Sequence, residues 1–558
     1  MKFSEMPYKR INIEEVQDFF KKLIEEFNNA RSGEEQFEIH KKYYKMMGDI
    51  KTNLIIAEFR HDIDTTEEYY AEESEYNDEI RPLIDQCETE YKEALYNSAY
   101  RDYLEGKIGK LAFKNMELAM KSFDEKIVPL LQEENALISK YDKLIASAKI
   151  PFDGEEYNIS LLRKHLTGEN RDTRKRAWKA LSDYFMSVTD EIDDIYDKLV
   201  KNRTQQAKEL GYDNYIELGY NKMMRNSYRR PEVENFRKQI KESFVPFVTK
   251  IQQARKNNIG VDELKYYDNE VYFKNGNPAP TGTPEEIMQA GLDMYKELSP
   301  ETAEFFDFMM ENELFDVLGR KTKKQGGYMD FLPKYKAPII FANFNGTSGD
   351  VDVITHECGH AFQGYVTRNE EIVEHNELTM ETAEIHSMSM EYFTYGWMDR
   401  FFGDRADDYL KMHIQDAIIF VPYGCMVDEF QHIVYEKPEM TPAERKNVWK
   451  ELEKTYRPWL DFDGDPFFDN GGWWQKQGHI FWSPFYYIDY VLASVVAMQF
   501  KVWMDKDFKD AWNHYLELCK LSVKDSYETE LEAVGLKSPF KDGTVENLVK
   551  ELETKVEL

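Results

Sequence analysis

Two histidines and one glutamate stand within a single short segment, His356-Glu357-Cys358-Gly359-His360. On a helix, His356 and His360 would lie one turn apart on the same face, so both imidazoles can bind one divalent cation. Glu357 would lie beside that cation without having to bind it, which is the position of a base that activates water. A solvated stripe on a surface helix is the alternative interpretation of this motif taken alone.

A catalytic zinc ion needs a third protein ligand and an open position for water. Residues 377–393, ELTMETAEIHSMSMEYF, predict a second helix on which three glutamates share one face at intervals of seven residues: Glu377, Glu384 and Glu391. We predict Glu384 as the third ligand and Glu381 as a carboxylate that orients a histidine from behind. The alternative is a solvated helix face, but the apolar neighbours of Glu384 leave little room for solvent.

A third histidine ligand close after the motif is excluded by the residues at those positions. That arrangement requires glycine at position 363 and histidine at position 366, whereas this chain has Gln363 and Val366. Cys358 lies two residues after His356 and should point away from both histidines on a helix. We therefore predict that Cys358 packs in the interior, and glutamate stays favoured as the third ligand.

Polar groups also gather in an aromatic segment further along the chain. Gly471-Gly472-Trp473-Trp474 is followed by His479 and by the run Tyr486-Tyr487-Ile488-Asp489-Tyr490. Phenol and imidazole groups can donate hydrogen bonds to the negative oxygen of a tetrahedral intermediate. The alternative is aromatic core packing with internally satisfied hydroxyls, and the spacing does not decide between the two.

The elements expected to carry these residues are almost all helices. Apolar residues recur three and four positions apart, and helix starts are legible at Thr283-Pro284, Ser299-Pro300 and Thr441-Pro442. The main exception is 337–344, a short apolar run that predicts a strand leading into the motif helix. We predict that helix over 351–368, with Ser348 or Asp350 capping its start. The predicted fold class is all-α with a small β-sheet near the site.

A change in amino-acid composition near residue 150 divides the chain. Residues 64–148 are charged, tyrosine-rich and helical in period, and they end at a proline and glycine break, 149–154. Because 558 residues exceed what one hydrophobic core usually serves, we expect two lobes. We place an N-terminal helical domain at 1–150 and a catalytic helical domain at 151–558.

Composition limits the partners and the compartment. A net charge of −32 argues against nucleic acid and anionic membranes as partners. The four cysteines form no C-x-x-C pair, and the N-terminus shows no secretory signal, so a reducing cytoplasm is expected. The apolar stretch 480–500 contains Pro484 and Asp489 and predicts a buried core helix rather than a membrane span.

Five segments together resemble a known family, the zinc oligopeptidases related to thimet oligopeptidase, and within it the bacterial oligoendopeptidase F and Pz-peptidase branch. The likeness rests on these segments, in order over about residues 170 to 545: 341–344 (FANF), 356–363 (HECGHAFQ), 381–391 (ETAEIHSMSME), 427–431 (VDEFQ) and 479–490. The N-terminal part matches this family only in being helical.

The resemblance implies a helical fold of two lobes around a deep channel, one zinc ion, and cleavage of short peptides. It implies His356, His360 and Glu384 as zinc ligands and Glu357 as general base and acid. It also implies three donors to substrate and transition state: His479, Tyr487 and Tyr490. A one-residue shift would exchange Tyr486 for Tyr487. In such relatives the strand before the motif pairs with the substrate backbone, so residues 339–344 are expected to form an edge.

The expected function is therefore that of a zinc metalloendopeptidase acting on short peptides. Two other functions are weighed against it: a non-catalytic helical scaffold or peptide-binding protein, and a zinc hydrolase of non-peptide amides. The intact base between two intact ligands argues against the scaffold. The sequence does not indicate an oligomeric state.

Overall fold

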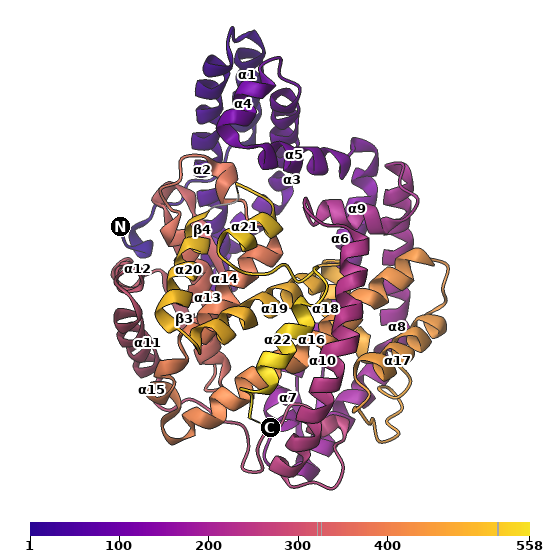
Figure 1. Ribbon diagram of the computed structural model, residues 1–558. Coiled ribbons are helices and arrows are strands. Elements are labelled where there is room, and N and C mark those ends of the chain that lie inside the picture. Colours follow the sequence, from indigo (N-terminus) through magenta and orange to yellow (C-terminus); the bar gives the residue numbers. More distant parts are fainter. Residues whose placement is uncertain (321, 325, 522–523, 558) are drawn as a thin grey trace. The chain divides into compact units, whose positions relative to one another are not determined.

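The structure, a computed structural model, describes residues 1–320, 322–324, 326–521 and 524–557. It is mainly helical with two small sheets, which confirms the predicted fold class (Figure 1). The chain packs into two compact units: unit 1 is Met1–Met120, Ala279–Ala406 and Trp503–Leu536, and unit 2 is Lys121–Pro278, Asp407–Val502 and Lys537–Leu558. This partition is interleaved along the chain, and the domain boundary at residue 150 stays a prediction.

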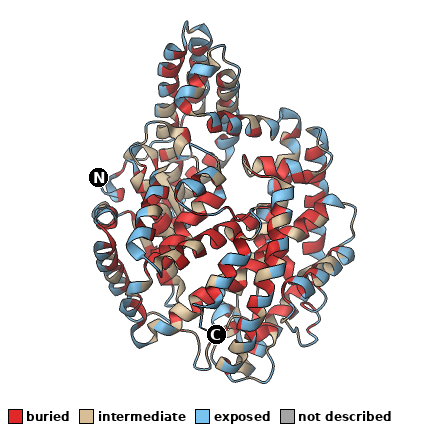
Figure 2. Cartoon of the chain, viewed as in Figure 1, coloured by how far each residue is buried: buried red, intermediate tan, exposed pale blue. Residues whose placement is uncertain are grey.

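Unit 1 carries the motif helix. Its helices are α1 (Ile13–Asn29), α2 (Gly33–Ile63), α3 (Glu68–Tyr96), α4 (Arg101–Ile108), α5 (Lys110–Lys121), α11 (Pro284–Leu298), α12 (Pro300–Glu311), α13 (Gly349–Val366), α14 (Met380–Phe393), α15 (Asp399–Phe402), α20 (Phe508–Leu521) and α21 (Tyr527–Ala533). The first three share a core that includes Phe20, Tyr43 and Tyr91. Amphipathic helices such as α11 show one buried and one exposed side (Figure 2).

A three-stranded sheet precedes the motif helix in unit 1. Strand β5 (Ala337–Phe344) lies between β3 (Phe315–Leu318), which is parallel to it, and β4 (Tyr328–Leu332), which is antiparallel. The predicted strand is confirmed, but its expected place at an edge is wrong. Because β5 pairs on both sides, an added peptide strand would have to pair with β3 or β4 instead.

The predicted helix starts are confirmed at all three positions. Thr283, Ser299 and Thr441 each accept a hydrogen bond from the backbone N–H three residues later, and proline occupies the first helical position. These helices are α11, α12 and, in unit 2, α17 (Pro442–Tyr456). At these three positions a hydroxyl followed by proline marks a helix start, whereas Ser483-Pro484 and Ser538-Pro539 lie in turns or loops.

The start of the motif helix differs from the prediction. Helix α13 begins at Gly349, and the Ser348 side chain makes no capping hydrogen bond. The carboxylate of Asp350 accepts instead from the backbone N–H groups of Asn345 and Gly346, each at 2.8 Å. The predicted cap is wrong because Asp350 fastens the turn before the helix rather than the helix itself.

Unit 2 contains the remaining helices and a two-stranded sheet. Its elements are α6 (Val128–Ala146), β1 (Ile150–Phe152), β2 (Glu155–Tyr157), α7 (Ile159–Leu166), α8 (Arg171–Glu209), α9 (Tyr215–Lys222), α10 (Arg230–Ile259), α16 (Ala406–Glu436), α17, α18 (Gly478–Trp482), α19 (Tyr487–Met504) and α22 (Thr544–Glu553). The stretch 480–500 is largely buried, as predicted, but it forms two helices with a break around Pro484. Among the described residues, no helix combines the length and apolarity that a membrane crossing would need.

Candidate active site

Helices α13 and α14 touch backbone to backbone at one glycine. A Cβ atom placed on Gly359 would lie 2.6 Å from Cα of Ser387 and 2.7 Å from the carbonyl oxygen of His386. Such distances are far shorter than a van der Waals contact, so any side chain at this position would separate the helices. Gly359 stands between the two histidines of the motif and allows α14 to approach them.

Helix α20 packs against both of these helices. The Tyr515 hydroxyl donates to the carbonyl oxygen of His386 at 2.9 Å, and the Trp512 ring lies 6.0 Å from that of Phe362 on α13. Tyr515 is fully buried and Trp512 nearly so. The helix pair is therefore held in place by a segment that comes more than a hundred residues later in the chain.

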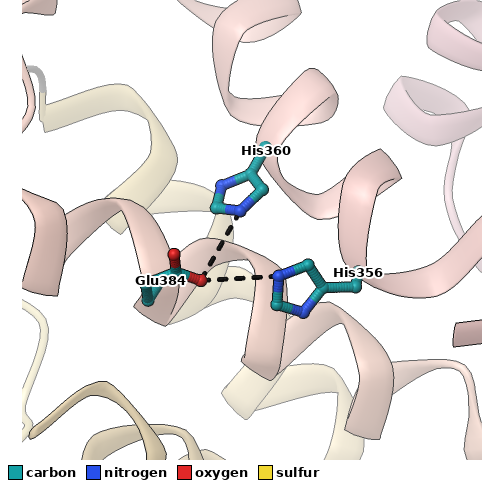
Figure 3. A group of neighbouring side chains, drawn as sticks. All are labelled: His356, His360 and Glu384. Carbon is teal, nitrogen blue, oxygen red and sulfur yellow. Dashed lines mark ion pairs between the residues drawn. The ribbon is translucent and has the colours of Figure 1, made fainter. Parts of the chain in front are cut away.

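The three side chains predicted as ligands lie together (Figure 3). His356 and His360 project from α13, and Glu384 projects from α14. Oε2 of Glu384 is 3.4 Å from Nε2 of His356 and 3.6 Å from Nε2 of His360, and the three candidate ligand atoms lie within 4.8 Å of one another. Two imidazole nitrogens and one carboxylate are a donor set that zinc uses in catalytic sites. The residues present therefore fit a zinc ion.

Electrostatics at this group favour the charged carboxylate. Burial alone would raise the pKa of Glu384, but hydrogen bonds from His356 and His360 outweigh it and leave the pKa well below its usual range. Burial opposes the charge on His356 as well, yet Glu384 and Glu391 raise its pKa well above the usual value. The pocket thus stabilises positive charge beside an ionised Glu384, which is the requirement of a cation site.

A second carboxylate, from Glu391, fixes the orientation of one histidine. Oε1 of Glu391 lies 2.6 Å from Nδ1 of His356, so Nε2 of the same ring faces Glu384. Sequence reasoning placed Glu391 on the ligand face but did not give it this contact, although its spacing of seven from Glu384 was the available signal. Glu381 is buried on the same helix, and its role in orienting a histidine stays a prediction.

The two other residues of the motif differ in environment. Glu357 is half-buried on α13 beside His356 and is not one of the three clustered ligand residues. Cys358 is fully buried, and burial raises the pKa of its thiol well above the usual value. A buried, protonated thiol packs as a small apolar group, which agrees with the prediction that Cys358 is interior.

The predicted donor residues form a second group, in unit 2. The His479 ring centroid lies 5.0 Å from that of Tyr487, 5.9 Å from Tyr490 and 6.0 Å from Tyr486. All four side chains are half-buried. Tyr486 and Tyr487 are both within ring contact of His479, so the geometry of this group alone does not choose between them.

A glutamine that sequence reasoning missed favours one tautomer of the His479 ring. Nε2 of Gln477 lies 2.9 Å from Nδ1 of His479, while Oε1 of Gln477 accepts from the Tyr423 hydroxyl at 2.7 Å. Because an amide nitrogen only donates, Nδ1 is the acceptor and Nε2 carries the ring proton. Nothing in the sequence points to Gln477 or to Tyr423 in this role.

Family models match most of the chain. The peptidase M3 N-terminal domain matches residues 3–123, and peptidase family M3 matches residues 165–518. No curated protein matches the chain in a sequence search.

Solved structures give the same result over the full length. A structure of Pz peptidase A with an inhibitor is 45% identical, with a TM-score of 0.94, and covers 100% of this chain and 99% of its own. A putative oligoendopeptidase F is 44% identical, with a TM-score of 0.94, covering 100% and 98%. A putative oligoendopeptidase F from Bacillus anthracis is 42% identical, with a TM-score of 0.89 and the same coverage.

A more distant structure, a putative peptidase from Chlamydophila abortus, is 15% identical with a TM-score of 0.73 and shares the fold alone. The family model that spans the greater part of the sequence and the close structural relatives lead to one assignment. This chain belongs to peptidase family M3 and is a metallopeptidase.

Proposed function

We propose that the chain is a zinc oligoendopeptidase that holds one zinc ion on His356, His360 and Glu384. The observation that carries this proposal is the convergence of their three ligand atoms within 4.8 Å, next to Glu357 on the same helix. The fit of the donor set supports zinc, which is also the metal typical of family M3.

A zinc ion bound there would supply a Lewis acid that lowers the pKa of water and polarises the scissile carbonyl group. Glu357 accepts the proton of the attacking water and then passes it to the leaving amine. Glu391 keeps Nδ1 of His356 engaged, so that Nε2 stays directed toward the ligand cluster. Ionised Glu384 would complete the ligand set.

We assign His479, Tyr487 and Tyr490 as donors to the substrate carbonyl and to the oxyanion. Two features support this role. Their rings cluster, and Nε2 of Gln477 lies 2.9 Å from Nδ1 of His479, which as its acceptor leaves the proton of a neutral ring on Nε2. Burial raises the pKa of the Tyr487 phenol well above its usual value, so it remains a donor at neutral pH. Donors that are already oriented stabilise a developing oxyanion more than mobile ones do.

Further observations support a substrate class, a location and a division into domains. The names of the solved relatives, Pz peptidase and oligoendopeptidase F, support short peptides as substrates. Buried, unpaired cysteines support a reducing cytoplasm: Cys87, Cys358, Cys425 and Cys519. The two family models lie on either side of residue 150, which supports an N-terminal domain at 1–150 and a catalytic domain at 151–558.

Glu357→Gln tests the assignment of the base. We expect this variant to keep one zinc ion per chain and to lose about 10²–10⁴-fold in kcat on a mixture of short peptides, because glutamine cannot accept a proton. Glu371→Gln, an exposed site outside the motif, is the matched control and should keep wild-type activity. Zinc is measured by elemental analysis, and peptide cleavage is measured with and without a chelator.

Ordinary peptidase activity in Glu357→Gln would contradict its role as base. Loss of zinc from that variant would instead show that Glu357 belongs to the ligand set. If the wild-type chain cleaved non-peptide amides but no peptide, the peptidase proposal itself would fail.

A further inference from the structure

The His479 and tyrosine group is built around a strained turn. Helix α18, with His479, ends at Trp482, and α19, with Tyr487 and Tyr490, begins at Tyr487. Between them, Phe485 has φ of 69°, in the left-handed region that residues other than glycine rarely adopt. Such a conformation persists only where the surroundings hold it in place. The turn at Phe485 therefore sets how the two helices present their donor residues.

One buried arginine binds the carbonyl side of this turn. Arg225 is almost completely buried, and its Nη2 donates to the carbonyl oxygen of Phe485 and, at 3.1 Å, to Oδ1 of Asp489. Asp489 lies between the two predicted donor tyrosines in the first turn of α19, and it also accepts from the Tyr228 hydroxyl at 3.1 Å. Arg225 thus fastens both the turn and the start of the tyrosine helix.

One buried glutamine binds the amide side of the same residue. The backbone N–H of Phe485 donates to Oε1 of Gln431 at 3.1 Å, and Nε2 of Gln431 donates to the carbonyl oxygen of Val427 at 3.3 Å. The next residue on α16, His432, packs its ring 4.8 Å from that of Phe485. Gln431 ends the VDEFQ segment, one of the motifs that carry the family resemblance and that the proposed mechanism leaves without a role.

A second buried arginine holds the end of α18. Arg203 donates to the carbonyl oxygens of Ile480, at 3.5 Å, and of Phe481, and its Nε donates to Glu134 at 2.5 Å. Carbonyl groups in the last turn of a helix have no partner within the helix, so a cation there satisfies and stabilises them. The two arginines thus bind backbone on both sides of the break.

Burying an arginine with its carboxylate does not by itself make a fold more stable, because the loss of hydration offsets the attraction. A buried arginine that binds a strained backbone segment instead holds that segment in a single conformation. We infer that Arg225 and Gln431 are positioning residues, which hold the left-handed turn at Phe485 and thereby fix Tyr487 and Tyr490 relative to His479. The catalytic meaning of this inference rests on the donor roles proposed above, whereas its geometric content does not.

Arg225→Lys tests the inference, with Arg255→Lys as matched control. Arg255 is equally buried in unit 2 but donates to the carbonyl oxygen of Asn269, on a different loop. Lysine keeps the charge but is shorter and lacks the rigid guanidinium that places Nη2, the nitrogen that makes both bonds. We expect Arg225→Lys to lower kcat by about 10²-fold and to change KM by less than about threefold. Arg255→Lys should leave both kcat and KM near wild type. Zinc content should stay at one ion per chain in both variants.

A readout independent of activity is the ¹⁹F chemical shift of 3-fluorotyrosine placed at position 490. We expect this resonance to move or broaden in Arg225→Lys and to stay at the wild-type position in Arg255→Lys. A wild-type resonance together with a kcat equal to that of the control would overturn the inference. If Tyr490→Phe and Tyr487→Phe keep full activity while the resonance still moves, the proposed donor roles fail and the positioning inference stands.

A second pair of variants applies if Arg225→Lys does not fold. Gln431→Glu keeps an acceptor for the Phe485 N–H, whereas Gln431→Met has a similar shape but leaves that group unpaired. We expect the fluorotyrosine shift and kcat to stay near wild type in Gln431→Glu and to change in Gln431→Met. Equal behaviour of the two would contradict a role for Gln431 in holding the turn.

Discussion

The proposed metal ligands and the proposed donor residues are positioned by different means. His356, His360 and Glu384 stand on two helices that touch at Gly359 and keep regular geometry at these residues. His479 and the tyrosines stand on two helices separated by a break with a left-handed residue. There, side chains from other helices hold the backbone.

This difference has a physical reason. Ligands to a metal must meet at one point, and residues four apart on a helix already share a face. Donors to an oxyanion must converge on a position that no single helix face provides, so the chain has to bend there. The bend costs backbone strain, and buried polar side chains such as Arg225 offset it.

Removing a ligand should give the largest effect, because nothing else in the regular pair of helices replaces it. We expect Glu384→Ala to lose zinc and at least about 10³-fold in kcat, since the metal supplies several kcal/mol of transition-state stabilisation. Elemental analysis and peptide cleavage measure the two losses. A variant that retained one zinc ion and wild-type kcat would show that the ligand cluster is not the metal site.

Removing one tyrosine hydroxyl tests the proposed donor residues. We expect Tyr487→Phe and Tyr490→Phe each to lower kcat by about 10²-fold, the typical cost of one oxyanion donor, and to keep zinc. Tyr486→Phe is the matched control, because its ring also lies next to His479. Should Tyr486→Phe be the damaging change and Tyr487→Phe the silent one, the assignment of the two neighbouring tyrosines would be reversed.

Glu391→Gln tests how much zinc binding by the ligand cluster depends on the contact between Glu391 and His356. Glutamine keeps an acceptor for Nδ1 of His356 but removes the charge. We expect zinc affinity to fall by about 10–100-fold, measured by competition with a chromogenic chelator. Unchanged affinity would mean that the backbone contact at Gly359, and not Glu391, fixes the histidine.

The smallest expected effect is on the stability of unit 1. Glu530 on α21 is buried, its Oε1 has no hydrogen-bond partner among the described residues, and burial raises its pKa to about 8. Because the folded pKa lies above the usual value of 4.5, the folded state loses stability as pH rises from about 4.5 to 8 and nothing further above that.

Glu530→Gln does not titrate and should escape this loss. We expect a Tm equal to wild type at pH 4 and higher by on the order of 2 °C at pH 9, measured by scanning calorimetry. Glu532→Gln, exposed on the same helix, is the control. An advantage of Glu530→Gln that was largest at pH 4 would contradict the direction of the pKa shift.

The regular region could largely be predicted from the sequence. The shared face of His356 and His360 follows from helix periodicity, and the choice of Glu384 follows from the apolar residues around it. Three helix starts follow from hydroxyl and proline pairs. The contact of Glu391 with His356 could not be predicted, because it depends on the distance between α13 and α14. Gly359 allows that distance to be short.

The irregular features were predicted least well. Pro484 was a signal for the break between α18 and α19, because the residue before proline avoids helical geometry, yet the apolar run around it hid the break. The central place of β5 was missed because β4 is half-buried and carries little apolar alternation. Neither Arg225 nor Arg203 could be assigned, since their partners lie far away in the sequence.

The late position of α20 in the chain affects how this enzyme is made. A chain leaving the ribosome has both ligand helices exposed long before Trp512 and Tyr515 are synthesised to cover them. Until then the α13 and α14 pair has no partner on that side, and its apolar surface is available to chaperones.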